Sequence, residues 1–160
     1  MSEQVLIIDD EKDTVDDILL ALQMRDISCR GETDPRSAIE SFRASPTDVV
    51  IVDYLLSAPI TGVDVINQMQ TIKPFTQFIL ISGRINRDLD EKTLTEELRR
   101  VIKANQYIPK PIDLHRLVEA VQSALKTIES SSKNWKTIAE QYENTSNVTP
   151  DEVRLLNEKI

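Results

Sequence analysis

The chain has 160 residues, of which 40% are hydrophobic and 29% are charged, a composition typical of one compact globular domain with some chain to spare. Its 19 basic and 27 acidic residues give a net charge of −8, which argues against nucleic-acid binding through bulk positive charge, because phosphates are neutralised by basic side chains. The single cysteine, Cys29, and the single histidine, His115, exclude an internal disulfide bond and zinc sites rich in Cys or His, and they argue against a Ser-His-Asp hydrolase.

Five segments are predicted to form strands. Residues 5–8, 49–52 and 78–81 are continuous apolar runs rich in β-branched side chains. Runs without polar alternation are typical of strands that are buried on both faces of a parallel sheet. Weaker strand patterns cover residues 27–30 and 107–108.

Apolar residues at helical spacing fill the gaps between these strands. The predicted helices are centred on residues 15–22, 35–42, 62–72, 94–102 and 114–125. Asp34 followed by Pro35 is typical of a helix start with proline at the first helical position, and Pro74 ends the third helix. The alternation of strand and helix predicts an α/β fold with a five-stranded parallel sheet that is covered by helices on both faces.

Three serines at residues 130–132 interrupt the helical pattern. We therefore divide the chain into a domain at residues 1–129 and a helical extension or linker at residues 130–160. One helical stripe of the extension carries apolar side chains, namely Trp135, Ile138, Ala139 and Tyr142. A second amphipathic segment is predicted from Thr149, which has the spacing of a capping box with Glu152.

Polar residues follow the strands at the edge where the carboxyl ends of a parallel sheet form a ligand-binding crevice. These residues are Asp9, Asp10, Asp53 and Ser82, and Lys110 follows the fifth predicted strand. Three converging carboxylates repel one another unless a cation lies between them, and hard oxygen ligands suit Mg²⁺. With a hydroxyl and an ammonium group beside them they suit a phosphoryl group, and a carboxylate can itself accept one.

This set of residues, in this order and each at a strand end, resembles the signature of the receiver domains of bacterial two-component response regulators. The resemblance covers about residues 3–127 of the chain. It implies a flavodoxin-like, doubly wound sheet, and it makes residues 1–129 a receiver domain with a C-terminal helical extension.

The resemblance implies a role for each matching acidic residue. Asp53 would be the phosphoacceptor. The cofactor would be Mg²⁺, and its protein ligands would be Asp9, Asp10, Asp53 and the backbone carbonyl of Leu55.

The resemblance also implies the residues that respond to phosphorylation. Ser82 would bind the phosphoryl group and Lys110 would pair with it. Tyr107 matches an aromatic switch position three residues before the lysine. Pro111 matches a proline that usually follows the lysine through a cis peptide bond, a geometry that is essentially restricted to proline.

Two stretches depart from the family pattern. From the acceptor the family usually reads D-x-x-M/L-P-x-x-x-G, whereas here proline comes six residues and glycine nine residues after Asp53. The segment at residues 83–106 is also longer than usual. Leu55 and Arg84 occupy two variable positions that tune autodephosphorylation in the family, and we expect their bulk to hinder the attacking water.

The implied function is a phosphorylation switch in a His-Asp phosphorelay, with no enzymatic activity beyond self-phosphorylation from a phosphodonor and slow autodephosphorylation. The implied partner is a sensor histidine kinase or a phosphotransfer protein. Phosphorylation would change the face formed by the fourth helix, the fifth strand and the fifth helix. We also expect homodimerisation, either through the extension or through the face of the fourth and fifth helices.

Other interpretations stay open. The chain could be a pseudo-receiver that never takes phosphate, the N-terminal fragment of a longer regulator with an output domain, or a small phosphatase with an aspartyl intermediate. Asp9 and Asp10 could have no role beyond capping the helix that follows them, and Tyr107 could simply fill its strand.

The sequence shows no targeting or membrane-spanning segment. The N-terminus has no basic start of a signal peptide, and no apolar run is long enough for a membrane span. The segment at residues 130–160 carries four basic and five acidic residues and ends before any recognition helix. We therefore expect a cytoplasmic protein that binds neither nucleic acid nor membrane.

Overall fold

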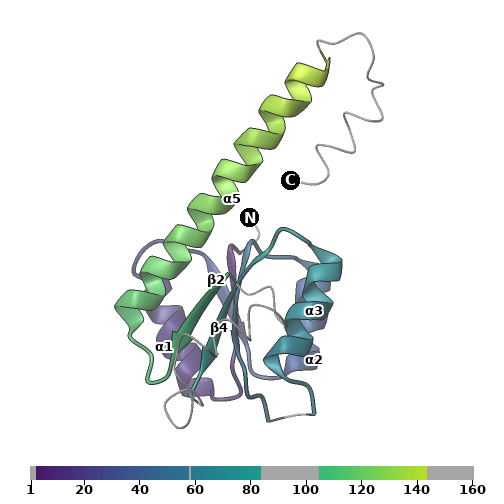
Figure 1. The fold of residues 1–160 in the computed structure, drawn as a ribbon. Coiled ribbons are helices and arrows are strands. Elements are labelled where there is room, and N and C mark those ends of the chain that lie inside the picture. The colour runs from purple at the N-terminus through teal and green to yellow at the C-terminus, as the bar shows by residue number, and fades with distance from the viewer. Residues whose placement is uncertain (1–2, 58, 84–104, 144–160) are drawn as a thin grey trace.

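The structure is a computed structural model that describes residues 3–57, 59–83 and 105–143 (Figure 1). Its centre is one parallel sheet in the order β2-β1-β3-β4-β5. The strands are β1 (Val5–Ile8), β2 (Cys29–Glu32), β3 (Val49–Asp53), β4 (Gln77–Ser82) and β5 (Gln106–Pro109). The described helices are α1 (Lys12–Gln23), α2 (Pro35–Ala44), α3 (Gly62–Ile72) and α5 (Leu114–Glu143). The predicted five-stranded parallel sheet is confirmed.

Helices cover both faces of the sheet and create two apolar cores. Alternate residues of each strand point to opposite faces, so Val5 and Ile7 pack with α1 and α5, whereas Leu6 and Ile8 pack with α2 and α3. Figure 1 shows α1 and the start of α5 on one side of the strands, with α2 and α3 on the other. Burial on both faces explains why the strands are continuous apolar runs.

Local sequence signals set the helix starts. The Asp34 carboxylate accepts a hydrogen bond of 2.9 Å from the backbone N–H of Ser37, and proline follows at the first helical position, as predicted. At the start of α3, Thr61 and Asp64 form a capping box in which each side chain binds the other residue's backbone N–H.

Strand β2 begins two residues later than the pattern at residues 27–30 predicts. The chain turns at Asp26, which has a φ of 58°, and Ile27 returns a hydrogen bond of 3.1 Å to the carbonyl of Leu22. Ile27 is therefore a core residue of the turn rather than of the strand. The predicted helix at residues 94–102, the residue Arg84 and the segment from Thr149 lie outside the described residues.

The predicted interruption at the three serines is wrong, because α5 runs without a break from Leu114 to Glu143. Serine costs a helix only roughly 0.5 kcal/mol per residue relative to alanine. An ion pair of 3.0 Å between Glu129 and Lys133 spans the three serines at the favourable i, i+4 spacing. The second half of α5 projects beyond the layer of the sheet (Figure 1). The domain division at residue 129 stays a prediction.

A membrane span is not found. None of the helices within residues 3–57, 59–83 and 105–143 is both long and apolar enough to cross a bilayer.

Gly62 is the residue on which the connection from β3 to α3 depends. A Cβ atom at Gly62 would lie 2.3 Å from the backbone oxygen of Asp53, a distance that side chains do not tolerate. The N–H of Gly62 also donates a hydrogen bond of 2.9 Å to the carbonyl of Tyr54. The first turn of α3 therefore packs directly on the backbone at the end of β3.

We predict that Gly62→Ala destabilises the protein by about 1–3 kcal/mol, because the backbone of Asp53 or of α3 must shift. Urea unfolding followed by circular dichroism measures this change. Gly83→Ala is the matched control, since its Cβ would meet Lys110 Cβ at 3.6 Å, an ordinary contact. Equal stabilities of the two variants would contradict the close approach.

Candidate functional site

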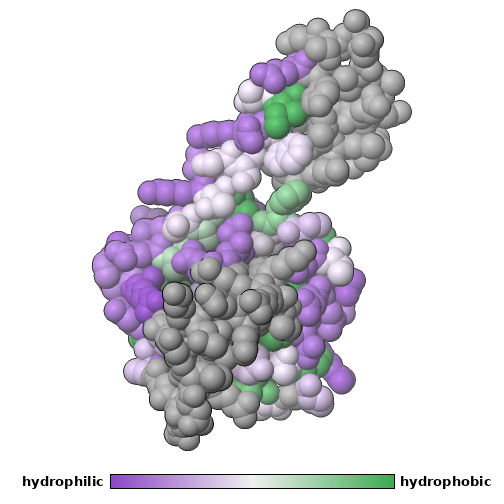
Figure 2. Space-filling view, viewed as in Figure 1, coloured by the Kyte–Doolittle hydropathy of each residue, from purple (hydrophilic) through white to green (hydrophobic). Residues whose placement is uncertain are grey.

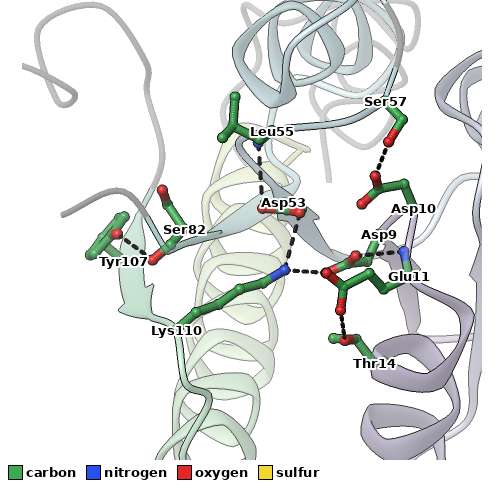
Figure 3. A network of polar contacts seen from close by, with 10 residues as sticks. All are labelled: Asp9, Asp10, Glu11, Thr14, Asp53, Leu55, Ser57, Ser82, Tyr107 and Lys110. Atoms are coloured by element: carbon green, nitrogen blue, oxygen red, sulfur yellow. Dashed lines mark hydrogen bonds and ion pairs between the residues drawn. The ribbon is translucent and has the colours of Figure 1, made fainter. Parts of the chain in front are cut away.

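The predicted site residues meet at the carboxyl edge of the sheet because the strand register puts them there. Asp53, the last residue of β3, pairs with Ile81 of β4, and Ser82 pairs with Pro109 of β5. Asp9 directly follows β1, and Lys110 directly follows β5. Figure 3 shows these side chains converging from the ends of β1, β3, β4 and β5.

Three carboxylates form the acidic part of the site. Asp9 is fully buried, Asp53 is 5% exposed and Asp10 is half-buried. One oxygen atom from each of the three lies within 4.8 Å of the others. Three hard oxygen donors at this separation fit a divalent cation such as Mg²⁺, which neutralises their mutual repulsion.

Lys110 bridges the two most buried carboxylates. Its Nζ lies 3.0 Å from Asp9 Oδ2 and 3.1 Å from Asp53 Oδ2 (Figure 3). Its backbone N–H donates a hydrogen bond of 2.9 Å to the carbonyl of Ser82, which fixes the end of β5 against β4. The peptide bond between Lys110 and Pro111 is cis, the isomer that the resemblance implies.

The crowding of charge changes the acidity of these groups. Burial raises the pKa of Asp53 to about 6, the neighbouring Asp9 carboxylate adds to the rise, and Lys110 opposes it. Burial also raises the pKa of Asp9. Burial alone would lower the pKa of Lys110, but its hydrogen bond to Asp9 and the charges of both carboxylates outweigh that effect and raise it. The site therefore holds more negative charge than one lysine compensates.

Ser82 and Tyr107 lie beside one another at the ends of β4 and β5. Ser82 is 3% exposed. The half-buried Tyr107 donates a hydrogen bond of 3.1 Å from its Oη to the carbonyl oxygen of Ser82. Tyr107 therefore contacts the end of β4 through its hydroxyl group and packs against the core with its ring.

The loop after β3 supplies further contacts. The backbone N–H of Leu55 donates to Asp53 Oδ1 at 3.4 Å, and the Leu55 side chain is 45% exposed. Ser57 Oγ donates a hydrogen bond to Asp10 Oδ2 (Figure 3). Sequence reasoning missed Ser57. The only sign of this contact in the sequence is that Ser57 places a hydroxyl group in the loop that follows Asp53.

Helix capping accounts for only part of the acidic pair. The N-cap residue of α1 is Glu11, and its side chain makes no capping hydrogen bond. Asp9 Oδ1 accepts a hydrogen bond of 2.9 Å from the backbone N–H of Glu11, but its Oδ2 binds Lys110. Asp10 instead contacts Ser57 across the crevice. Both carboxylates therefore face the site.

We predict that Asp53→Asn stabilises the metal-free protein at neutral pH. The folded-state pKa of about 6 lies above the ordinary value of 3.8, so the folded form binds the proton more tightly and stability falls as the pH rises between these values. Removing the charge should raise the free energy of unfolding by about 1–3 kcal/mol near pH 7. The gain should shrink as the pH falls through about 6, where Asp53 itself becomes neutral.

Urea unfolding in the presence of a chelator measures this effect. Asp48→Asn is the control, because Asp48 lies at the opposite edge of the sheet, where it pairs with Lys73 at 2.7 Å. We expect no gain from the control. A loss of stability in Asp53→Asn at neutral pH would contradict the prediction.

Comparisons with known proteins agree with this geometry. The family model "Response regulator receiver domain" matches residues 5–122. Sensory transduction protein RegX3 of Mycolicibacterium smegmatis is 25% identical over 122 residues, which are 76% of this chain and 50% of that protein. Regulatory protein VanRc of Enterococcus gallinarum is 27% identical over 126 residues, or 79% of this chain and 51% of that protein. The chain spans about half the length of these curated relatives.

Solved structures show the same fold. A response regulator receiver domain protein of Clostridium thermocellum has a TM-score of 0.65 at 24% identity, covering 78% of this chain and 95% of that one. A CheY-like receiver domain protein of Methanospirillum hungatei has a TM-score of 0.69 at 17% identity, covering 82% and 99%. Since the family model covers well over half of the chain, the protein belongs to the response regulator receiver domain family.

Proposed function

We propose that the protein is a phosphorylation switch in which Asp53 accepts a phosphoryl group from a sensor histidine kinase or a phosphotransfer protein. The observation that carries the proposal is the position of Asp53, whose carboxylate lies 3.1 Å from Lys110 and within the acidic cluster. A carboxylate beside a fixed cation and a metal-binding cluster is suited to phosphoryl transfer.

In the proposed reaction an Asp53 carboxylate oxygen attacks the phosphorus atom of the donor. A bond forms between that oxygen and phosphorus, and the bond between phosphorus and the donor's leaving group breaks. Asp9, Asp10, Asp53 and the Leu55 carbonyl would hold Mg²⁺, which supplies charge neutralisation for the phosphoryl oxygens when it is bound. Lys110 contributes the second positive charge, and burial at the strand ends limits access of water.

The acyl phosphate would be bound by residues that already surround Asp53. Lys110 is close enough to exchange part of its contact with Asp9 and Asp53 for a phosphoryl oxygen. The Ser82 hydroxyl would donate to another. Because Tyr107 is bonded to the Ser82 carbonyl, a shift of Ser82 would move Tyr107 and the surface of β5. Phosphorylation would thus shift the equilibrium between two existing conformations.

The lifetime of the phosphorylated state depends on how water reaches Asp53. Leu55 is 45% exposed next to the acceptor, and its apolar side chain would hinder an attacking water molecule. We assign the same role to Arg84, which lies outside the described residues.

The projecting part of α5 offers a surface for a second copy of the chain. Apolar and small side chains recur along it at alternating spacings of four and three residues, the pattern of a two-stranded coiled coil. In the projecting part the positions are Ile128, Ser132, Trp135 and Ala139, whereas Val121 and Leu125, in the same register, pack in the domain core. Beside these positions, Lys133, Asn134 and Lys136 are exposed. Figure 2 shows apolar side chains among hydrophilic ones on this part of the helix.

The first prediction from this function concerns phosphorylation itself. After incubation with acetyl phosphate and Mg²⁺, the intact mass should show one added phosphoryl group, and a chelator should prevent it. Asp53→Asn should abolish the adduct, whereas Asp48→Asn, the same change at the opposite edge of the sheet, should keep it. An adduct that survives in Asp53→Asn would contradict the assignment of the acceptor. Absence of both the adduct and Mg²⁺ binding in the unaltered protein would favour a pseudo-receiver.

The second prediction concerns self-association through α5. Trp135→Ala should weaken the dimer about tenfold or more, because large aromatic side chains dominate the binding energy of such interfaces. Asn134→Ala, on the exposed side of the same turn, should leave it unchanged. Sedimentation velocity over a range of protein concentrations measures both. A purely monomeric unaltered protein, with and without phosphorylation, would refute dimerisation through this helix.

A further inference from the structure

The three carboxylates of the site do not share their partners equally. Lys110 Nζ pairs with Asp9 and Asp53, at 3.0 and 3.1 Å. Asp10 stands outside these two ion pairs, and its Oδ2 accepts a hydrogen bond from Ser57 Oγ. Figure 3 shows Ser57 on the far side of Asp10 from the lysine. The third carboxylate of the cluster is thus held by a hydroxyl group rather than by a positive charge.

The loop that carries Ser57 is anchored at Leu56 before it and is closed at Gly62 further along the chain. The preceding residue, Leu56, is 7% exposed and packs in the core between the sheet, α2 and α3. On the other side, the hydrogen bond of 2.9 Å from Gly62 to the carbonyl of Tyr54 closes the loop, and Thr61 caps α3. With Leu56 pointing into the protein, the exposed Ser57 side chain is left to face Asp10 across the crevice.

Fixing Asp10 has a consequence for ligand binding. A free carboxylate rotates about its side-chain bonds, and a cation that binds it must stop that rotation. A hydroxyl donor bound to one oxygen restricts the rotation in advance and leaves the other oxygen available, so part of the entropy cost is met before the cation arrives.

We propose that Ser57 is a positioning residue that holds the Asp10 carboxylate in its cation-binding orientation and thereby sets the affinity of the site for Mg²⁺. The proposal rests on the proposed function in one respect, namely that the acidic cluster binds this cation. It concerns a feature of this chain, because Ser57 stands four residues after the acceptor, where the family pattern usually has proline, which carries no hydroxyl.

Direct binding of Mg²⁺ to the unphosphorylated full-length chain is the first test. We expect Ser57→Ala to raise the dissociation constant measured by isothermal titration calorimetry about tenfold, the effect usual for residues that orient metal ligands. Ser57→Thr keeps a hydroxyl and should stay within about twofold of the unaltered protein. Ser123→Ala is the matched control, because it makes the same change on an exposed position of α5.

The phosphorylation rate with acetyl phosphate, measured over a range of Mg²⁺ concentrations, separates positioning from a general structural effect. Ser57→Ala should raise the Mg²⁺ concentration that gives half of the maximal rate by the same factor. It should leave the maximal rate within about twofold, because Asp53 and Lys110 are untouched. The melting temperature should also stay unchanged, since Ser57 is exposed.

Three results would overturn the proposal. Unchanged Mg²⁺ affinity in Ser57→Ala would mean that the hydroxyl positions nothing, and tighter binding would mean that it competes with the cation. A lower maximal rate with unchanged affinity would place Ser57 in the transfer step instead. If the unaltered protein itself binds no Mg²⁺, the proposed function fails together with this inference, a result that differs from all three.

Discussion

The interaction on which the site depends is the contact of Lys110 with Asp9 and Asp53. Two carboxylates buried this close together strongly disfavour being ionised at the same time. One ammonium group between them offsets that repulsion only in part, which is why the pKa of Asp53 still stands at about 6. The remaining excess of negative charge favours the binding of a divalent cation.

The sheet dictates where these charges meet. Because all five strands are parallel, their carboxyl ends share one edge, and the register puts Ser82 next to Pro109 and therefore beside Lys110. Asp53 belongs to β3, the middle strand, so it has neighbours from both halves of the sheet. Gly62 allows the first turn of α3 to pack directly against the backbone at the end of β3, so the loop between them closes beside the acidic cluster.

The strands and the site residues could both be predicted from the sequence, because one physical constraint determines them. A strand buried on both faces must be apolar throughout, so an aspartate such as Asp53 directly after such a run marks both the strand end and the crevice. The continuity of α5 could not be predicted from the three serines, because each serine destabilises a helix only slightly and the exposed ion pair between Glu129 and Lys133 offsets part of that cost. The contact of Ser57 with Asp10 could not be predicted either, because it depends on how a loop directs one hydroxyl group towards a residue 47 positions away.

The carbonyl oxygen of Ser82 links the charged centre to the surface of the domain. It accepts hydrogen bonds from the backbone N–H of Lys110 at 2.9 Å and from the Tyr107 hydroxyl at 3.1 Å. The residue that neutralises Asp53 and the aromatic residue at the edge of β5 therefore share one acceptor. A displacement of Ser82 towards a phosphoryl group on Asp53 would strain both hydrogen bonds together. In the proposed switch, a movement of Ser82 would therefore disturb the contacts of Tyr107 and Lys110 together, and β5 would carry the change towards the surface.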